Sequence, residues 1–346
     1  MTTSVSSTVA SDTTIALDGN STYDGNTTVT ALQLSCIIGR DTQFIIGISI
    51  TSLGIIGNIA FMFVVGRIQS MRTMTNSYLV NLALADLLHS VVHSLIWNCI
   101  FFGGDVCFLH EWQMYCGVMF PSRVSQYVSM FTVTILSIER YLALCKPIIY
   151  RGGYIHKRSF VATVIALTWI ASIMISTEGL VDCLNSKTRS IAGRFIYLLT
   201  VFILLIVVVI FYLLIIIRVR RSRNSVKKNE FQIIRVCFAA AIVYFVCTMP
   251  AVLQAFILLL QDLNSFTLSD DLIMCLTNAS TFLLEINSSA NPVVYNALSS
   301  LYRKAFMDAF NCRNQKCCPG SSHYGRNSPT NTEMTSYNQI KTNKNN

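Results

Sequence analysis

The sequence carries little charge. Only 12% of its 346 residues are Asp, Glu, Lys or Arg, whereas an ordinary soluble domain carries about 25%. Hydrophobic residues make up 53% of the chain, and the mean hydropathy is +0.52. The few charges are segregated, which leaves apolar blocks such as 44–65 and 196–217 that can span a bilayer of about 30 Å hydrocarbon thickness. An ordinary soluble domain is excluded, and we predict an all-α membrane protein.

Residues 1–40 lack a long apolar stretch, and the first few carry no basic side chain. We therefore expect no cleavable signal peptide and expect the first membrane helix to direct insertion. Ser, Thr, Asn and Asp dominate residues 1–41, which is typical of a disordered tail. Asn20 and Asn26 begin glycosylation sequons in this segment, so we predict an extracellular, glycosylated tail.

The twelve cysteines and the net charge of +9 indicate neither a disulfide scaffold nor a nucleic-acid partner. Most of the cysteines lie within apolar blocks, where a thiol behaves as a small hydrophobe. A soluble nucleic-acid-binding protein would carry a basic patch without long apolar blocks. We therefore interpret the positive charge as a signal of membrane topology.

Seven membrane helices and a short amphipathic eighth helix are predicted. The membrane helices are expected at 42–66, 74–101, 115–144, 159–179, 195–220, 229–260 and 271–298. Lys and Arg gather in alternate connections, so the positive-inside rule places the amino terminus outside and the carboxyl terminus inside. Residues 298–310 place apolar side chains on one helical stripe, which predicts a helix on the inner membrane surface. The predicted membrane domain is thus 42–310, followed by a cytoplasmic tail at 311–346.

Three cysteines follow the predicted amphipathic helix: Cys312, Cys317 and Cys318. They stand where S-palmitoylation would reinforce anchoring to membrane lipids. Ordinary reduced cytosolic thiols explain the same residues equally well, so both interpretations stay open.

Polar side chains recur inside the apolar helices, where they are costly and usually mark a function. The set comprises Asn58, Asp86, Ser129, Asn287, Ser288 and Asn291. A carboxylate surrounded by oxygen-bearing side chains can hold a hard cation, a proton or water. A hydrated packing cluster without an ion is the alternative.

An ordered set of short motifs, about one per expected helix, resembles the rhodopsin-like (class A) G protein-coupled receptors. The set comprises Gly57-Asn58, Leu82-Ala83-Leu84-Ala85-Asp86, Glu139-Arg140-Tyr141, Trp169, Pro250 and Asn291-Pro292-Val293-Val294-Tyr295. Each motif is weak alone, but the ordered set is specific and covers 42–310. The resemblance implies a plasma-membrane receptor, not an enzyme, that needs no cofactor. An extracellular ligand would drive it to activate a heterotrimeric G protein, with arrestin as a further partner.

The resemblance also assigns roles. The polar cluster looks like the family's sodium and water site, with Asp86 as the sodium ligand. Arg140 would pair with Glu230 in the inactive state, and release of that pair would let the sixth helix move outward. Tyr212 and Tyr295 would then stabilise the open state. For Glu230, a solvated acid at a helix start is the alternative.

Cys116 and Cys183 resemble the family's extracellular disulfide, which an oxidising compartment permits. Cys107 competes with Cys116 for this role, and Cys36 and Cys275 are candidates for a second bridge. Sequence alone leaves the connectivity open.

The ligand pocket is expected between the outer halves of the helices. Its candidate residues are polar or charged: Ser122, Arg123, Gln126, Glu178, Thr248 and Glu285. By the resemblance, Ser122 replaces the aspartate of amine receptors and Glu285 replaces the retinal lysine of opsins, so neither ligand is expected. Arg123 and Glu285 could pair with each other or bind opposite ends of a ligand. The mixed charge favours a peptide or a zwitterion over a lipid, and a neuropeptide receptor is the leading hypothesis.

Two other functions compete with a signalling receptor. A seven-span transporter or channel could use Asp86 and Glu285 in an ion path, but transporters usually show internal repeats or broken helices, and the sequence shows neither. A receptor-like protein that no longer signals is the third hypothesis, because Thr248 replaces the usual tryptophan of the sixth helix.

Overall fold

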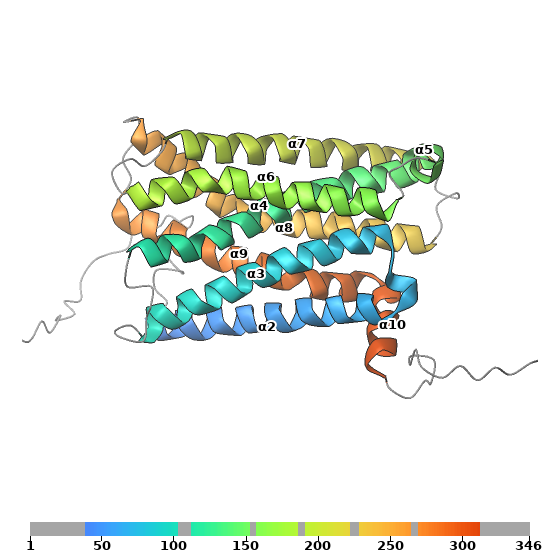
Figure 1. The fold of residues 1–346 in the computed structure, drawn as a ribbon, viewed down its shortest axis with the longest axis horizontal. Coiled ribbons are helices and arrows are strands. Elements are labelled where there is room, and N and C mark those ends of the chain that lie inside the picture. The colour runs from blue at the N-terminus through green and yellow to red at the C-terminus, as the bar shows by residue number, and fades with distance from the viewer. Residues whose placement is uncertain are drawn as a thin grey trace, which may run out of the picture.

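The computed structural model describes residues 39–102, 112–152, 157–185, 191–221, 228–263 and 269–311. Long helices fill most of these ranges and confirm the predicted helical bundle. They are α2 (Arg40–Arg67), α3 (Met74–Phe102), α4 (Trp112–Cys145), α6 (Arg158–Asn185), α7 (Ile191–Arg221), α8 (Lys228–Asp262) and α9 (Asp270–Leu298). Figure 1 shows them running side by side along the long axis of the molecule.

Three short elements lie at one end of this bundle. The 3-10 helix η1 (Gln69–Met71) and the helix α5 (Pro147–Gly152) form in connections, and α10 (Ser300–Phe310) follows α9. Figure 1 shows α10 turned across the end of the bundle that also carries α5. Helix α10 buries Tyr302 and leaves Met307 64% exposed, so the predicted amphipathic helix is confirmed.

Length and apolar composition qualify six of the described helices to cross a membrane: α2, α3, α4, α6, α7 and α8. Helix α9 is not among them, because polar side chains such as Glu285 and Asn287 lower its hydropathy. These side chains are buried, and α9 packs against α2, α3 and α8. The polarity of the seventh long helix therefore faces the bundle interior.

The outer surface of the bundle is apolar. Met174 of α6 is 67% exposed and Phe202 of α7 is 61% exposed. Polar groups face inward instead: the Trp169 indole donates to Asn81 Oδ1 at 2.9 Å, and the Asn81 amide donates to Thr132 Oγ1 at 2.8 Å. These bonds join α6, α3 and α4. An apolar exterior with paired polar groups inside is the arrangement that a lipid solvent requires.

An aromatic cluster anchors α10 to the bundle. The Phe61 ring of α2 lies 4.9 Å from the Tyr295 ring of α9 and 6.2 Å from the Tyr302 ring of α10. The Tyr302 hydroxyl also donates to Asn76 Oδ1 of α3 at 2.7 Å. Helix α10 is therefore fixed to α2, α3 and α9.

Helices α2 and α3 approach closely at Gly47. A β-carbon at Gly47 would lie 2.5 Å from Cε2 of the Trp97 indole. That indole cannot move away easily, because its Nε1 donates to Glu285 at 2.5 Å. Only glycine fits this contact.

We predict that Gly47→Ala destabilises the protein, because overpacking typically costs about 1–3 kcal/mol. The thermal midpoint of detergent-solubilised protein should fall by several degrees. Gly66→Ala is the matched control, since no atom lies within 4 Å of a β-carbon at Gly66 of the same helix. Equal midpoints for the two variants would contradict the close approach.

Candidate functional site

Arg140 lies near the end of α4, shortly before α5, and it is 6% exposed. Its Nε donates to Glu139 Oε2 at 2.5 Å, and its Nη2 donates to Glu139 Oε1 at 2.5 Å and to the Thr75 hydroxyl. The Tyr150 hydroxyl of α5 donates to the same carboxylate at 2.5 Å. Burial and the Glu139 carboxylate raise the pKa of Tyr150, which keeps that hydroxyl protonated. The guanidinium is thus enclosed.

The expected pair between Arg140 and Glu230 is not formed. The ion pair of Arg140 in the described part of the chain is with Glu139, and Glu230 makes no ion pair within the described ranges. The structure therefore corrects the predicted latch: α4 and α8 are not joined by this pair here.

Tyr212 and Tyr295 are buried, at 4% and 0% exposure. Within the described part of the chain neither hydroxyl has a hydrogen-bond partner. The Tyr212 ring packs against Phe238 of α8 at 5.0 Å between centroids. Buried hydroxyls usually find partners, so an arrangement of helices that pairs them would be favoured.

The predicted polar cluster gathers around Asp86 of α3. The Asn291 amide donates to Asp86 Oδ2 at 2.6 Å, and the Ser129 hydroxyl donates to Oδ1 at 3.4 Å. The Asn58 amide donates to the Ser288 carbonyl oxygen at 2.9 Å, which joins α2 to α9. Four helices, α2, α3, α4 and α9, therefore meet at this cluster.

A small cavity of about 20 Å³ lies beside the cluster. Ser129, Asn287 and Ser288 line it, together with His89 and Thr248. A cavity of this size holds about one water molecule. Hydroxyl, amide and carboxylate oxygens are ligands of hard cations, so the donor set also fits a sodium ion.

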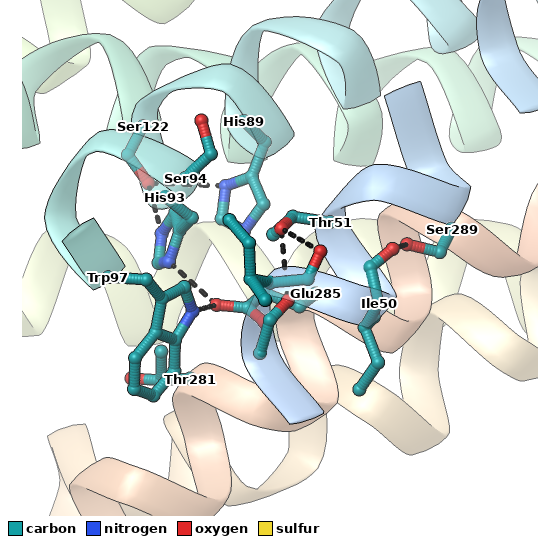
Figure 2. A network of polar contacts seen from close by, with 12 residues as sticks. Ile50, Thr51, His89, His93, Ser94, Trp97, Ser122, Thr281, Glu285 and Ser289 are labelled. Atoms are coloured by element: carbon teal, nitrogen blue, oxygen red, sulfur yellow. Dashed lines mark hydrogen bonds and ion pairs between the residues drawn. The ribbon is translucent and has the colours of Figure 1, made fainter. Parts of the chain in front are cut away.

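Glu285 of α9 is 1% exposed and does not pair with Arg123. Its Oε1 accepts a hydrogen bond from Trp97 Nε1 at 2.5 Å and lies 3.2 Å from His93 Nδ1. Figure 2 shows both of these side chains of α3 joined to one oxygen of the Glu285 carboxylate. The carboxylate is therefore held within the bundle. It lines neither the small cavity beside Asp86 nor the larger pocket described below.

A chain of hydrogen bonds continues from this carboxylate. His93 Nε2 lies 3.1 Å from Ser122 Oγ, which lies 3.2 Å from His89 Nδ1 (Figure 2). The centroids of the His89 and His93 imidazole rings are 4.1 Å apart. His89 lines the small cavity beside Asp86, which we call the inner cavity. His93 lines a second, larger cavity, which we call the outer pocket, so the chain of hydrogen bonds connects the two.

Sequence reasoning missed both histidines and Trp97. The signal was present, because Asp86, His89, His93 and Trp97 follow one another at helical spacing on one face of α3.

The outer pocket has a volume of about 650 Å³. Four of the predicted ligand residues line it: Ser122, Arg123, Gln126 and Glu178. Thr248 lines the inner cavity instead, where its hydroxyl donates to the Tyr244 carbonyl oxygen at 2.6 Å. Arg194, which also lines the outer pocket, forms an ion pair with Asp262 that joins α7 to α8.

A disulfide joins Cys116 to Cys183, with their Cα atoms 5.8 Å apart. This confirms the predicted bridge and decides between Cys116 and Cys107. Cys183 lies in the last turn of α6, not in a loop, so the bridge joins the ends of α4 and α6. Cys275 is also disulfide-bonded. The other predicted cysteine and glycosylation sites lie outside the described residues: Asn20, Asn26, Cys36, Cys107, Cys312, Cys317 and Cys318.

Comparison with known proteins supports the arrangement. The chain matches the 7 transmembrane receptor (rhodopsin family) over residues 57–295. It is 26% identical to somatostatin receptor type 4 of Rattus norvegicus over 293 residues, which cover 77% of this chain and 71% of the relative. It is 27% identical to neuropeptide Y receptor type 2 of Mus musculus over 304 residues, which cover 76% and 74%. The family match confirms that the chain is a multi-pass membrane protein and not an enzyme.

We predict that Glu285→Ala destabilises the protein whether or not ligand is present. The variant leaves the buried donors of Trp97 and His93 without their acceptor, which costs about 1–3 kcal/mol for each group. The measurement is the thermal midpoint of the solubilised protein.

Glu178→Ala is the matched control for this prediction, because Glu178 is exposed in the outer pocket. Its midpoint should stay near that of the wild type. A stable Glu285→Ala protein with selectively weakened ligand binding would instead make Glu285 a ligand group.

Proposed function

Because this chain belongs to the rhodopsin family of seven-transmembrane receptors, we propose that it binds an extracellular peptide and activates a heterotrimeric G protein. One observation carries the proposal: the buried Arg140–Glu139–Thr75 cluster lies at one end of the bundle, and the outer pocket opens between the helix ends that the Cys116–Cys183 bridge holds. Binding at one end can then change helix packing at the other.

Pocket chemistry supports a peptide ligand. A volume of about 650 Å³ accommodates several side chains, and its lining mixes aromatic, amide and charged groups. The somatostatin and neuropeptide Y receptors to which the chain is similar are peptide receptors. A peptide can match such a lining with complementary groups.

Arg123 is the charged group best placed to anchor that ligand. It is exposed within the outer pocket and forms no ion pair among the described residues. Its guanidinium packs over Gly179 of α6, where a β-carbon would lie 3.1 Å from Nη1. A guanidinium binds a carboxylate through charge-assisted, often bidentate, hydrogen bonds. The ligand is therefore expected to present a carboxylate to Arg123.

Activation follows from a shift between two packings of the helices. In the packing described here, Glu139, Thr75 and Tyr150 enclose the Arg140 guanidinium. A ligand that favours outward movement of α8 would expose Arg140 to the G protein. The Tyr212 and Tyr295 hydroxyls would gain partners in the opened cleft, which offsets part of the energy of opening.

A sodium ion at the Asp86 cluster would stabilise the closed packing. Asp86 would supply the charge, and Ser129, Asn287 and Ser288 line the adjoining cavity with further oxygens. Since these residues come from three helices, an ion held among them resists their separation.

A second function has one observation in its favour. Thr248 donates its hydroxyl within its own helix and lacks the bulk of the aromatic residue usual at this place. A receptor that binds ligand without signalling would be consistent with this substitution.

We expect Arg140→Ala to lose at least about tenfold in G protein activation, the effect of removing one charge-assisted contact. Cells expressing wild type and variant are exposed to a peptide library, and G protein activation is measured for equal surface expression. Loss of activation with retained peptide binding supports the proposal. Unchanged activation would remove Arg140 from the mechanism, and binding without activation by wild type would favour the non-signalling receptor.

The peptides selected above also test the ligand anchor. Arg123→Gln should weaken their binding by about 10-fold or more, and amidation or neutralisation of the contacting peptide carboxylate should have the same effect. Gln126→Ala, one turn along the same pocket wall, is the comparison for general loss of contact.

We expect sodium chloride to raise the thermal midpoint of the purified receptor above that in choline chloride of equal ionic strength. Asp86→Asn should abolish this difference, because it removes the charge that pairs with the ion. Glu178→Gln removes an exposed carboxylate and should preserve it. A sodium effect that survives Asp86→Asn would place the ion elsewhere.

A further inference from the structure

Helix α10 begins without a cap of its own. Its N-cap residue, Ser299, makes no side-chain capping bond, and its backbone is extended at φ −132° and ψ 119°. The first N–H groups of a helix have no partner within the helix and need one elsewhere.

Gln232 of α8 supplies that partner from a different helix. Its Oε1 accepts from the Leu301 backbone N–H at 3.3 Å and from the Ser299 hydroxyl at 3.1 Å. Its Nε2 lies 2.9 Å from Ser300 Oγ. The backbone N–H of Leu301 can only donate, so this contact fixes which end of the amide faces α10. One side chain of α8 thus contacts three consecutive residues at the α9–α10 junction.

The junction itself is anchored independently of α8. The Tyr302 hydroxyl donates to Asn76 of α3, and Arg303 Nη1 donates to the carbonyl oxygens of Asn296 and Ala297 at 2.8 and 3.0 Å. When α8 moves, α10 therefore stays with α3 and α9. Ser299 is fully buried. If α8 moves away, the Ser299 hydroxyl therefore loses Gln232 as its hydrogen-bond partner while it stays inside the protein.

We propose that Gln232 is the inactive-state latch of this receptor and takes the place of the absent Arg140–Glu230 pair. The inference rests on the proposed function, in which α8 moves outward during activation. That movement separates Gln232 from residues 299–301 and leaves the first turn of α10 uncapped. Glu230 lies two residues earlier on α8 and makes no ion pair in the described ranges, so it does not hold α8 in this way.

Basal G protein activation, normalised to surface receptor, tests the latch. Gln232→Ala should raise it about 3- to 10-fold, since loss of a few neutral hydrogen bonds shifts the closed–open equilibrium by that order. Gln232→Glu keeps an acceptor for Leu301 and Ser299 and should stay near wild type. Glu230→Ala should also stay near wild type, whereas a rise equal to that of Gln232→Ala would overturn the proposal.

A distance measurement separates this test from the test of G protein coupling. Spin labels are introduced as genetically encoded amino acids at Arg235 of α8 and Lys304 of α10, both exposed, in the full receptor in nanodiscs without G protein. Gln232→Ala should add a longer-distance population that wild type and Gln232→Glu lack. An unchanged distance distribution would overturn the latch even if the receptor signals, and a new population would support it even if no G protein responds.

Discussion

Polar side chains at membrane depth must find their partners inside the protein, because lipid supplies none. Much of this structure follows from that constraint. Asp86, Glu285 and Arg140 each place an ionisable group inside the bundle. Side chains of neighbouring helices bond to Asp86 and Glu285 directly, and to Arg140 and its partner Glu139. The helices are therefore positioned by a few paired polar groups together with the apolar side chains that pack between them.

The helices could be predicted from the sequence because an apolar block long enough to cross a bilayer has few alternatives. The Cys116–Cys183 bridge and the grouping of Asn291 and Ser129 around Asp86 followed from the family resemblance. Individual pairings across helices could not be predicted in the same way. Glu285 pairs with His93 and not with Arg123 because helix rotation and rotamer decide which of several charged groups within reach becomes the partner.

The two cavities share lining residues of α4, α7 and α9, and polar side chains of α3 and α4 also join them. His93 borders the outer pocket, His89 borders the inner cavity, and Ser122 lies between their rings. Thr248, in contrast, directs its hydroxyl to its own helix backbone. The polar path between the two cavities thus consists of hydrogen bonds, and their strength depends on the placement of single protons.

The polarity of α9 has a consequence for biosynthesis. A charged residue at the centre of a membrane helix disfavours insertion by about 2.5–3.5 kcal/mol, and α9 carries Glu285 in addition to several amides. It is also made after the other long helices that the structure describes. By then α2 and α3, which contribute Asn58, Asp86 and Trp97 as its partners, have already been made. The earlier helices therefore offer hydrogen-bond partners that offset part of the cost of placing α9 in the bilayer.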